Sequence, residues 1–276
     1  MLKRISTYYK NHGLGHLLKK FVSKSIVLLK LVEDVPSARI RISNKIYEIC
    51  NGEVRYGILK GLKLEINDMN WSRADLGSIL LGIYEKEVMD EIDKISKKNT
   101  IFCDIGAADG IFGVGFLVNG IFNKSLCFEI DKNGRENIKK LALKNNLETK
   151  VKILQEASAS SMNDMEDIDW SDVCILIDIE GEEFNFIDNE FLGVVDKSTL
   201  IIEIHDQYTE NPEESRRNLS DTLASKYTIK KVTTSSRDLS NVDEIKYLHD
   251  NDRWLLCSEG RGWRMEWWIC EPKSND

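Results

Sequence analysis

Residues 101–110 read IFCDIGAADG, and this stretch decides the fold. Its first half, Ile101–Ile105, is apolar apart from one aspartate, as is typical of a strand buried on both faces. Small residues follow at Gly106, Ala108 and Gly110, and they permit a tight turn whose backbone can approach a ligand closely. A buried strand that ends in such a turn before a helix is typical of nucleotide-binding α/β folds.

Beyond this stretch, short apolar segments alternate with longer helical patterns. The expected strands are Ile101–Ile105, Leu126–Ile130, Val151–Leu154, Val173–Ile177 and Leu200–Ile204. The expected helices between them are Phe112–Asn119, Asn133–Asn145 and Glu182–Glu190. This alternation predicts an α/β fold of the Rossmann-like type, with a mostly parallel sheet and helices on both faces. Later in the chain, the expected strands are Tyr227–Val232 and a closing antiparallel pair, Arg253–Cys257 with Trp263–Cys270.

The same patterns divide the chain into three parts. Residues 1–50 are expected to form a basic helical extension, 51–99 a hairpin (54–66) and helices that lead into the core, and 100–276 the ligand-binding domain. Residues 1–30 hold seven lysines or arginines and no aspartate or glutamate. Their helical periodicity predicts an amphipathic helix that caps the body or makes a dimer contact. The alternative is a peripheral contact with an anionic membrane surface or a membrane-linked protein.

Composition excludes several classes of protein. The 276 residues are 42% hydrophobic and 30% charged, with a net charge of -8, so we expect no bulk attraction to nucleic acid. No apolar run approaches the length of a membrane-spanning helix, and the basic N-terminus does not read as a signal peptide, so a cytoplasmic location is expected. The six cysteines contain no CxxC pair, which predicts reduced, buried thiols.

Polar side chains occur where the expected strands end, which is where such sheets bind ligands. Glu129 follows the second strand and could accept hydrogen bonds from ribose hydroxyls. Asp178 and Glu180 follow the fourth strand and could orient a cofactor, hold a cation or accept a proton. His205 follows the fifth strand, where it is either a general base or a structural hydrogen-bonding residue.

The turn after the first strand also argues against some cofactors. A dinucleotide-binding turn has glycine at its sixth position, where this chain has the bulky Ile111. No GxxxxGK[ST] motif occurs, so a P-loop is absent. A nicotinamide-dependent oxidoreductase is therefore disfavoured, but it remains an alternative, as does a catalytically silent cofactor-binding subunit.

Five blocks of sequence, in order and at matching spacing, carry a family resemblance. They are GIYE (82–85), DIGAADG (104–110), IDIEGEE (177–183), IIEIH (201–205) and RMEWWICEP (264–272). Together they resemble the class I S-adenosylmethionine-dependent methyltransferases, and within them the FkbM family, from about Tyr56 to Pro272. The chain departs from the family at Asp109, where asparagine is usual.

The resemblance implies a methyltransferase sheet with an antiparallel closing strand, S-adenosylmethionine as cofactor, and O-methylation of a sugar, a glycan precursor or a similar small molecule. In that family the turn cradles the methionine part, an acid after the second strand binds the ribose, and residues after the third strand lie beside the adenine. The implied cofactor-binding residues are Glu85, Asp104, Gly106, Ala107, Ala108, Gly110, Glu129, Ile130, Glu156, Ala157 and Asp178.

Methyl transfer to an alcohol requires that the hydroxyl lose its proton. We hypothesise that His205 accepts this proton and that Asp178 or Glu180 orients the imidazole. A second route is a divalent cation, magnesium, bound by Asp178 and neighbouring acids.

Four late tryptophans and three arginines raise a further question about the acceptor. The tryptophans are expected mainly in buried closing strands, with stacking on a sugar as the alternative. The arginines suggest an acceptor with a phosphate or carboxylate group. The residues are Trp254, Trp263, Trp267 and Trp268, with Arg253, Arg261 and Arg264.

Overall fold

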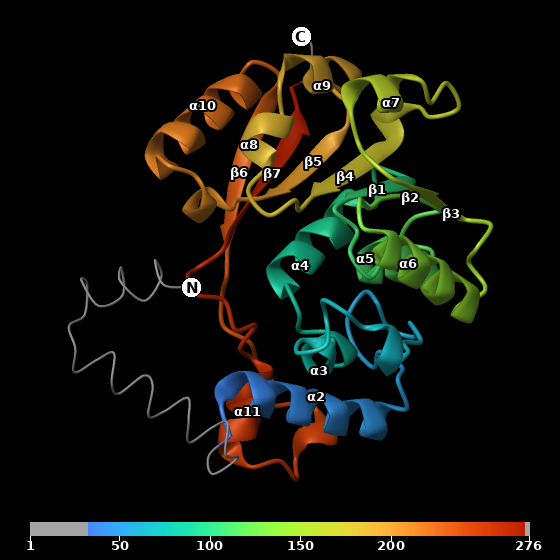
Figure 1. The fold of residues 1–276 in the computed structure, drawn as a ribbon, viewed down its shortest axis with the longest axis vertical. Coiled ribbons are helices and arrows are strands. Elements are labelled where there is room, and N and C mark those ends of the chain that lie inside the picture. Colours follow the sequence, from blue (N-terminus) through green and yellow to red (C-terminus); the bar gives the residue numbers. More distant parts are fainter. Residues whose placement is uncertain (1–32, 274–276) are drawn as a thin grey trace.

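The structure, a computed structural model, describes residues 33–273 and is built around a single sheet (Figure 1). The strands are β1 (Ile101–Ile105), β2 (Lys124–Phe128), β3 (Val151–Leu154), β4 (Val173–Ile177), β5 (Thr199–Glu203), β6 (Tyr227–Thr233) and β7 (Glu266–Pro272). Within the described residues they form a seven-stranded sheet in the order β3-β2-β1-β4-β5-β7-β6. β1 to β5 pair in parallel, and β7 is antiparallel to both β5 and β6. The predicted Rossmann-like α/β fold with an antiparallel closing strand is confirmed.

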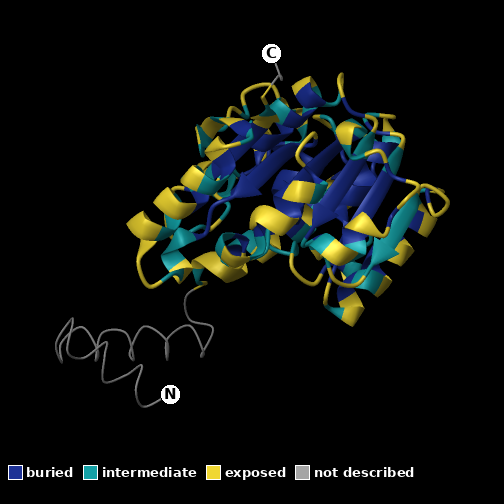
Figure 2. Ribbon diagram, turned by 90° about the horizontal axis from the view of Figure 1, so that it is seen from above, coloured by how far each residue is buried: buried dark blue, intermediate teal, exposed yellow. Residues whose placement is uncertain are grey.

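Helices cover both faces of the sheet, because the central strands β4 and β5 are buried on both sides. On one face α5 (Ile111–Val118) and α6 (Lys132–Lys144) share a core with Phe102 of β1. On the other, α7 (Ala159–Asn163), α9 (Asn189–Val194) and α10 (Pro212–Ala224) share a second core with the next residue of β1, Cys103. The sheet is therefore buried between two helical layers, as Figure 2 shows.

Segments from both ends of the chain extend the first of these layers. They include α2 (Val35–Cys50), α3 (Leu76–Leu80), α4 (Lys86–Ile95) and α11 (Asp250–Leu256), the first and last of which lie side by side (Figure 1). Arg41 of α2 makes a two-pronged ion pair with Asp252 of α11, with both N···O distances at 3.0 Å. Leu256 packs so closely on Gly77 that a Cβ there would lie 2.8 Å from the leucine Cδ2.

Two local expectations are wrong. Arg253–Cys257 is not a closing strand: residues 250–256 form α11, with aspartates in its first turn that favour a helix N-terminus. β7 pairs instead with β6. The expected hairpin at 54–66 contains no regular strand, only an isolated bridge between Glu53 and Lys63. Its backbone still folds back, since the Val54 N–H donates to Leu62 O at 2.9 Å.

Several of the remaining expectations fall beyond what the structure describes or are refined by it. The basic helix expected in residues 1–30 lies outside the described residues. No helix within 33–273 is long and apolar enough to cross a membrane. All six cysteines are free thiols, and five of them are buried. β2 and β5 end slightly earlier than expected, so Glu129 and His205 stand just beyond their strands.

Candidate functional site

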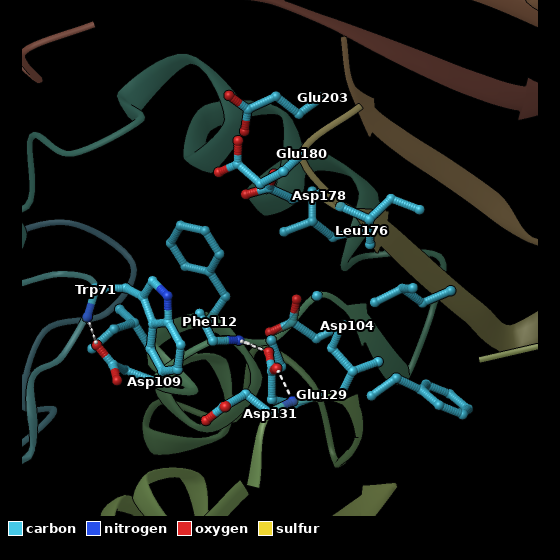
Figure 3. A pocket seen from close by; sticks show the side chains of 18 of the residues that line it. Trp71, Asp104, Asp109, Phe112, Glu129, Asp131, Leu176, Asp178, Glu180 and Glu203 are labelled. Carbon is cyan, nitrogen blue, oxygen red and sulfur yellow. Dashed lines mark hydrogen bonds between the residues drawn. The ribbon is translucent and has the colours of Figure 1, made fainter. Parts of the chain in front are cut away.

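A cleft of about 920 Å³ opens at the carboxyl ends of β1, β2, β4 and β5 (Figure 3). This is the end of a parallel sheet at which α/β proteins bind ligands. The structure brings together all but one of the site residues expected from the sequence. Those that line the cleft are Glu85, Asp104, Gly106, Ala107, Ala108, Glu129, Ile130, Glu156, Ala157, Asp178, Glu180 and His205.

The exception is Gly110, which is the N-cap residue of α5 but does not line the cleft. A Cβ at Gly110 would lie 2.9 Å from Ile138 Cγ1, so the glycine permits α5 and α6 to pack closely. Gly106 has a φ of +93°, and its Cβ would lie 1.8 Å from the carbonyl oxygen of Asp178. The small residues of the turn therefore permit close packing within the protein as well as the close approach of a ligand.

Glu129 is buried beside the turn, and backbone groups hold both of its carboxylate oxygens. Oε2 accepts a hydrogen bond from the Ala108 N–H and Oε1 from the Asp131 N–H, each at 2.7 Å. Each carboxylate oxygen has a second lone pair, so the group can still accept bonds from a diol. Ile130, which is 77% exposed, lies next to it at the rim.

Asp104 is the one charged residue within β1, and it is 2% exposed. Its Oδ2 accepts a hydrogen bond from the Gly113 N–H at 3.1 Å. Burial raises the pKa of this carboxyl to about 7, since the single backbone hydrogen bond offsets only part of the lost hydration. Asp104 therefore titrates close to neutral pH.

Asp109 is the residue at which the chain departs from the family pattern. Its carboxylate binds a loop of the N-terminal part to the turn. Its carboxylate accepts the backbone N–H groups of Asn70, Trp71 and Ser72 at 2.9–3.3 Å, and the side-chain amide of Asn137 at 3.1 Å. Both oxygens act as acceptors, which an asparagine could not reproduce. The contact places Trp71 at the rim of the cleft (Figure 3), a position for which the sequence held no signal except the aspartate itself.

The side chains expected to act in catalysis meet at the ends of β4 and β5. His205 Nε2 lies 3.7 Å from Asp178 Oδ1, 3.8 Å from Glu180 Oε2 and 3.6 Å from Glu203 Oε1. The imidazole is only 5% exposed. As expected from strand alternation, Glu203 and His205 lie on the same side of their segment. We call these four residues the His205 cluster.

Glu183 contacts both the backbone and the ring of His205 and so positions the imidazole, a role that the sequence does not reveal. Its Oε1 accepts the backbone N–H of His205 at 2.6 Å and lies 3.6 Å from Nδ1. Burial lowers the pKa of His205, but the contact with Glu183 and the charges of Glu203 and Glu180 outweigh it, so the pKa is raised above the ordinary value. A raised pKa leaves less neutral imidazole at neutral pH to act as a base.

Arg261 lies in the segment that precedes β7, and its side chain reaches the cleft. Its guanidinium contacts Glu203 Oε1 at 2.5 Å and Glu259 Oε2 at 2.9 Å, and it also pairs with Glu85. Burial nevertheless raises the pKa of Glu85 to about 8, with repulsion from Glu203 in the same direction. Burial and the charges of Glu203 and Glu85 also raise the pKa of Asp178 well above its ordinary value.

The three late arginines do not converge on an acceptor site. Arg253 pairs with Asp250 on α11 and Arg264 contacts the hydroxyl of Thr233, so only Arg261 reaches the cleft. The expectation of an arginine set for an anionic acceptor is therefore wrong. Among the described residues of the lining, Arg261 is the single arginine or lysine, against many carboxylates. The cleft is thus strongly acidic and favours cationic ligands.

Exposed aromatic rings border the His205 cluster. Tyr208, in η3 (Asp206–Tyr208), stacks on the His205 ring with centroids 6.0 Å apart, and Trp263 meets Tyr208 edge-on at 6.2 Å. Tyr208 is 58% and Trp263 50% exposed. Trp267 and Trp268 are buried in β7 as expected, whereas Trp254 is exposed on α11.

Three members of the cluster have the composition of a metal site. Asp178, Glu203 and His205 each offer one potential ligand atom, and these atoms all lie within 4.8 Å of one another. The sequence predicts a cation at Asp178 and nearby acids, and the structure adds a nitrogen donor to that set.

Comparison with known proteins identifies no family for this chain. No family model matches it, and no curated protein matches it. An O-methyltransferase from Bacillus cereus in complex with S-adenosylhomocysteine superposes with a TM-score of 0.46 at 9% identity, over 91% of this chain and 97% of that one. The m1A22 tRNA methyltransferase TrmK of B. subtilis gives a TM-score of 0.44 at 12% identity, over 67% of this chain and 65% of that one. Likeness at this level does not identify an activity or an acceptor.

Proposed function

We propose that this protein is an S-adenosylmethionine-dependent methyltransferase of the FkbM type, which methylates a hydroxyl group of a carbohydrate or a similar small molecule. One observation carries the proposal. A single acidic cleft contains the turn at Gly106, the carboxylate of Glu129 and, at its other end, the His205 cluster. The first two features suit a nucleoside-containing cofactor, and the cluster suits proton removal from an acceptor.

The residues present fit the cofactor. Glu129 would accept the ribose hydroxyls, and Ile130 with Glu156 and Ala157 would flank the adenine. The turn from Gly106 to Ala108 would lie under the methionine part. The cofactor's sulfonium and ammonium groups are positive, and they match the excess of carboxylates in the cleft.

When bound, the cofactor supplies a methyl group on a sulfonium sulfur, which leaves readily as a neutral thioether once an oxygen attacks the methyl carbon. The protein's contribution is then mainly orientation of the two reactants. The His205 cluster would assist the loss of the hydroxyl proton, either directly at Nε2 or through a bound cation. Tyr208 and Trp263 would present their exposed rings to the acceptor beside His205.

The charge of the cleft supports a small neutral acceptor in preference to nucleic acid. A phosphate backbone binds through arginine and lysine side chains, and Arg261 is already paired with three carboxylates. The rings of Tyr208 and Trp263 could instead stack on a sugar. The FkbM assignment and the O-methyl specificity rest on the sequence resemblance.

The test is a transfer assay with methyl-tritiated S-adenosylmethionine and a panel of monosaccharides, nucleotide sugars and hydroxylated metabolites, with bulk tRNA as a separate arm. We expect label in a hydroxylated small molecule and a large loss of turnover in His205→Ala. Label in tRNA alone would contradict the proposed acceptor. Thermal stabilisation by NAD but not by S-adenosylhomocysteine would favour the oxidoreductase alternative.

A further inference from the structure

We infer that Asp178, Glu203 and His205 bind a divalent transition-metal cation of the Mn²⁺ type at the carboxyl ends of β4 and β5. The use of this cation in methyl transfer rests on the proposed function, but its binding does not. Three features support the site: the spacing of the donor atoms, the lack of a hydrogen-bond partner at Asp178 Oδ1, and the support of the imidazole by a second carboxylate. Glu203 Oε1 is already paired with Arg261, and a cation would share this oxygen with the guanidinium.

The donor atoms are too far apart for hydrogen bonds but close enough to share an ion. Nε2 of His205 lies 3.7 Å from Asp178 Oδ1 and 3.6 Å from Glu203 Oε1. Hydrogen bonds between nitrogen and oxygen span about 2.7–3.2 Å. Metal–ligand bonds of roughly 2.0–2.2 Å separate neighbouring donor atoms by about 3.0–3.6 Å, so a small inward movement of the side chains completes the site.

Buried polar atoms of the site lack partners within the protein. Among the described residues, Asp178 Oδ1 and His205 Nδ1 are both buried without a hydrogen bond. The contacts of Nε2 with carboxylates also lie beyond hydrogen-bonding distance, and the imidazole is 5% exposed. Buried polar groups are nearly always paired. A cation at this point would bind Oδ1 and Nε2 together, which accounts for their orientation toward one another.

The surroundings of the imidazole match those of a metal-bound histidine. A ligating imidazole usually directs its other nitrogen at a carboxylate, which fixes the ring. Here Nδ1 faces Glu183 Oε1 at 3.6 Å, and the same oxygen accepts the His205 backbone N–H at 2.6 Å. Within the described residues, His205 is also the only basic side chain within 4.0 Å of the Asp178 carboxylate, so no lysine or arginine competes for it.

The donor set points to the kind of cation. Magnesium, the ion expected from the sequence, prefers oxygen donors throughout, whereas imidazole favours transition metals. Two carboxylates and one imidazole therefore favour Mn²⁺ or its neighbours over Mg²⁺. A cation here would bind the acceptor oxygen and lower the pKa of its hydroxyl, and the exposed carboxylate of Glu180 could take the proton.

The experiment is a titration of the full chain, freed of metal by a chelator, with Mn²⁺, in which free Mn²⁺ is followed by electron paramagnetic resonance. We expect one bound ion per chain. Asp178→Asn should weaken binding at least about tenfold, because it removes a charged ligand but keeps the shape of the side chain. Glu182→Gln is the matched control: it removes one negative charge from the same loop without touching the proposed ligands, and it should bind Mn²⁺ as the wild type does.

Absence of Mn²⁺ binding to the wild-type chain overturns the inference. Equal weakening in Glu182→Gln also overturns it, since the ion would then respond only to bulk negative charge. His205→Gln provides a second ligand variant if Asp178→Asn fails to fold by circular dichroism. Calorimetry with S-adenosylhomocysteine on the same samples separates the two proposals. Mn²⁺ binding without S-adenosylhomocysteine binding leaves the metal site intact and refutes the methyltransferase, and the converse result refutes only the metal site.

Discussion

The titration of Asp104 gives a quantitative test of how this cleft is built. Its carboxyl is buried in β1, and burial raises its pKa from the ordinary value of 3.8 to about 7. The native state therefore holds a proton that the unfolded chain has already lost between about pH 4 and pH 7. Stability from this group is fully present below about pH 4 and declines as the pH rises through 7. The difference between the two pKa values corresponds to about 4 kcal/mol in the free energy of unfolding.

Asp104→Asn should remove this pH dependence. Asparagine resembles the protonated acid and keeps an oxygen for the Gly113 N–H. We expect the variant to equal the wild type only well below pH 4, to exceed it by about 1 kcal/mol at pH 4.5, and to exceed it by up to about 4 kcal/mol at pH 8.5.

Urea unfolding at a series of pH values, with linear extrapolation, measures the difference. Asp221→Asn, an exposed change on α10, is the control and should run parallel to the wild type. If the Asp104→Asn and wild-type curves also run parallel from pH 4.5 to 8.5, the account of this buried carboxyl is refuted.

Three further substitutions probe other parts of the site. Gly106→Ala should lower the unfolding free energy by roughly 2 kcal/mol or more, read by urea unfolding, because φ is +93° and the new Cβ meets Asp178 O. Glu129→Ala should weaken S-adenosylhomocysteine binding about 10- to 100-fold in calorimetry, the equivalent of one or two charge-assisted hydrogen bonds; unchanged affinity would remove Glu129 from the cofactor site. Arg261→Met should lower the free energy of unfolding, measured with urea, by roughly 3–5 kcal/mol, because buried carboxylates lose their partner. A decrease smaller than about 0.5 kcal/mol would show that the ion pairs contribute little.

The sequence predicts the sheet well, because strands buried on both faces must be continuously apolar. The same logic places Glu129, Asp178 and His205 at one edge, since the carboxyl ends of parallel strands lie together. The strand alternation also puts Glu203 beside His205 correctly. These inferences depend on local pattern and on topology, both of which a single sequence contains.

Contacts between distant segments could not be predicted in the same way. The pairing of Arg261 with Glu85 joins residues 176 positions apart, and nothing in either segment signals it. The sequence of α11 predicts a strand where the structure has a helix, because seven residues are too few to distinguish the two periodicities. In the sequence Asp109 stands out only as a departure from the family pattern, and its hydrogen bonds to the loop at Trp71 are visible only in the three-dimensional structure.

The most direct test of the central claim is a crystal structure of the full chain with S-adenosylhomocysteine. We predict that the ribose hydroxyls contact the carboxylate of Glu129, that the methionine part lies along the turn at Gly106, and that the sulfur faces Asp178 and His205. A chain that does not take up the ligand, or that binds it outside this cleft, would contradict the account.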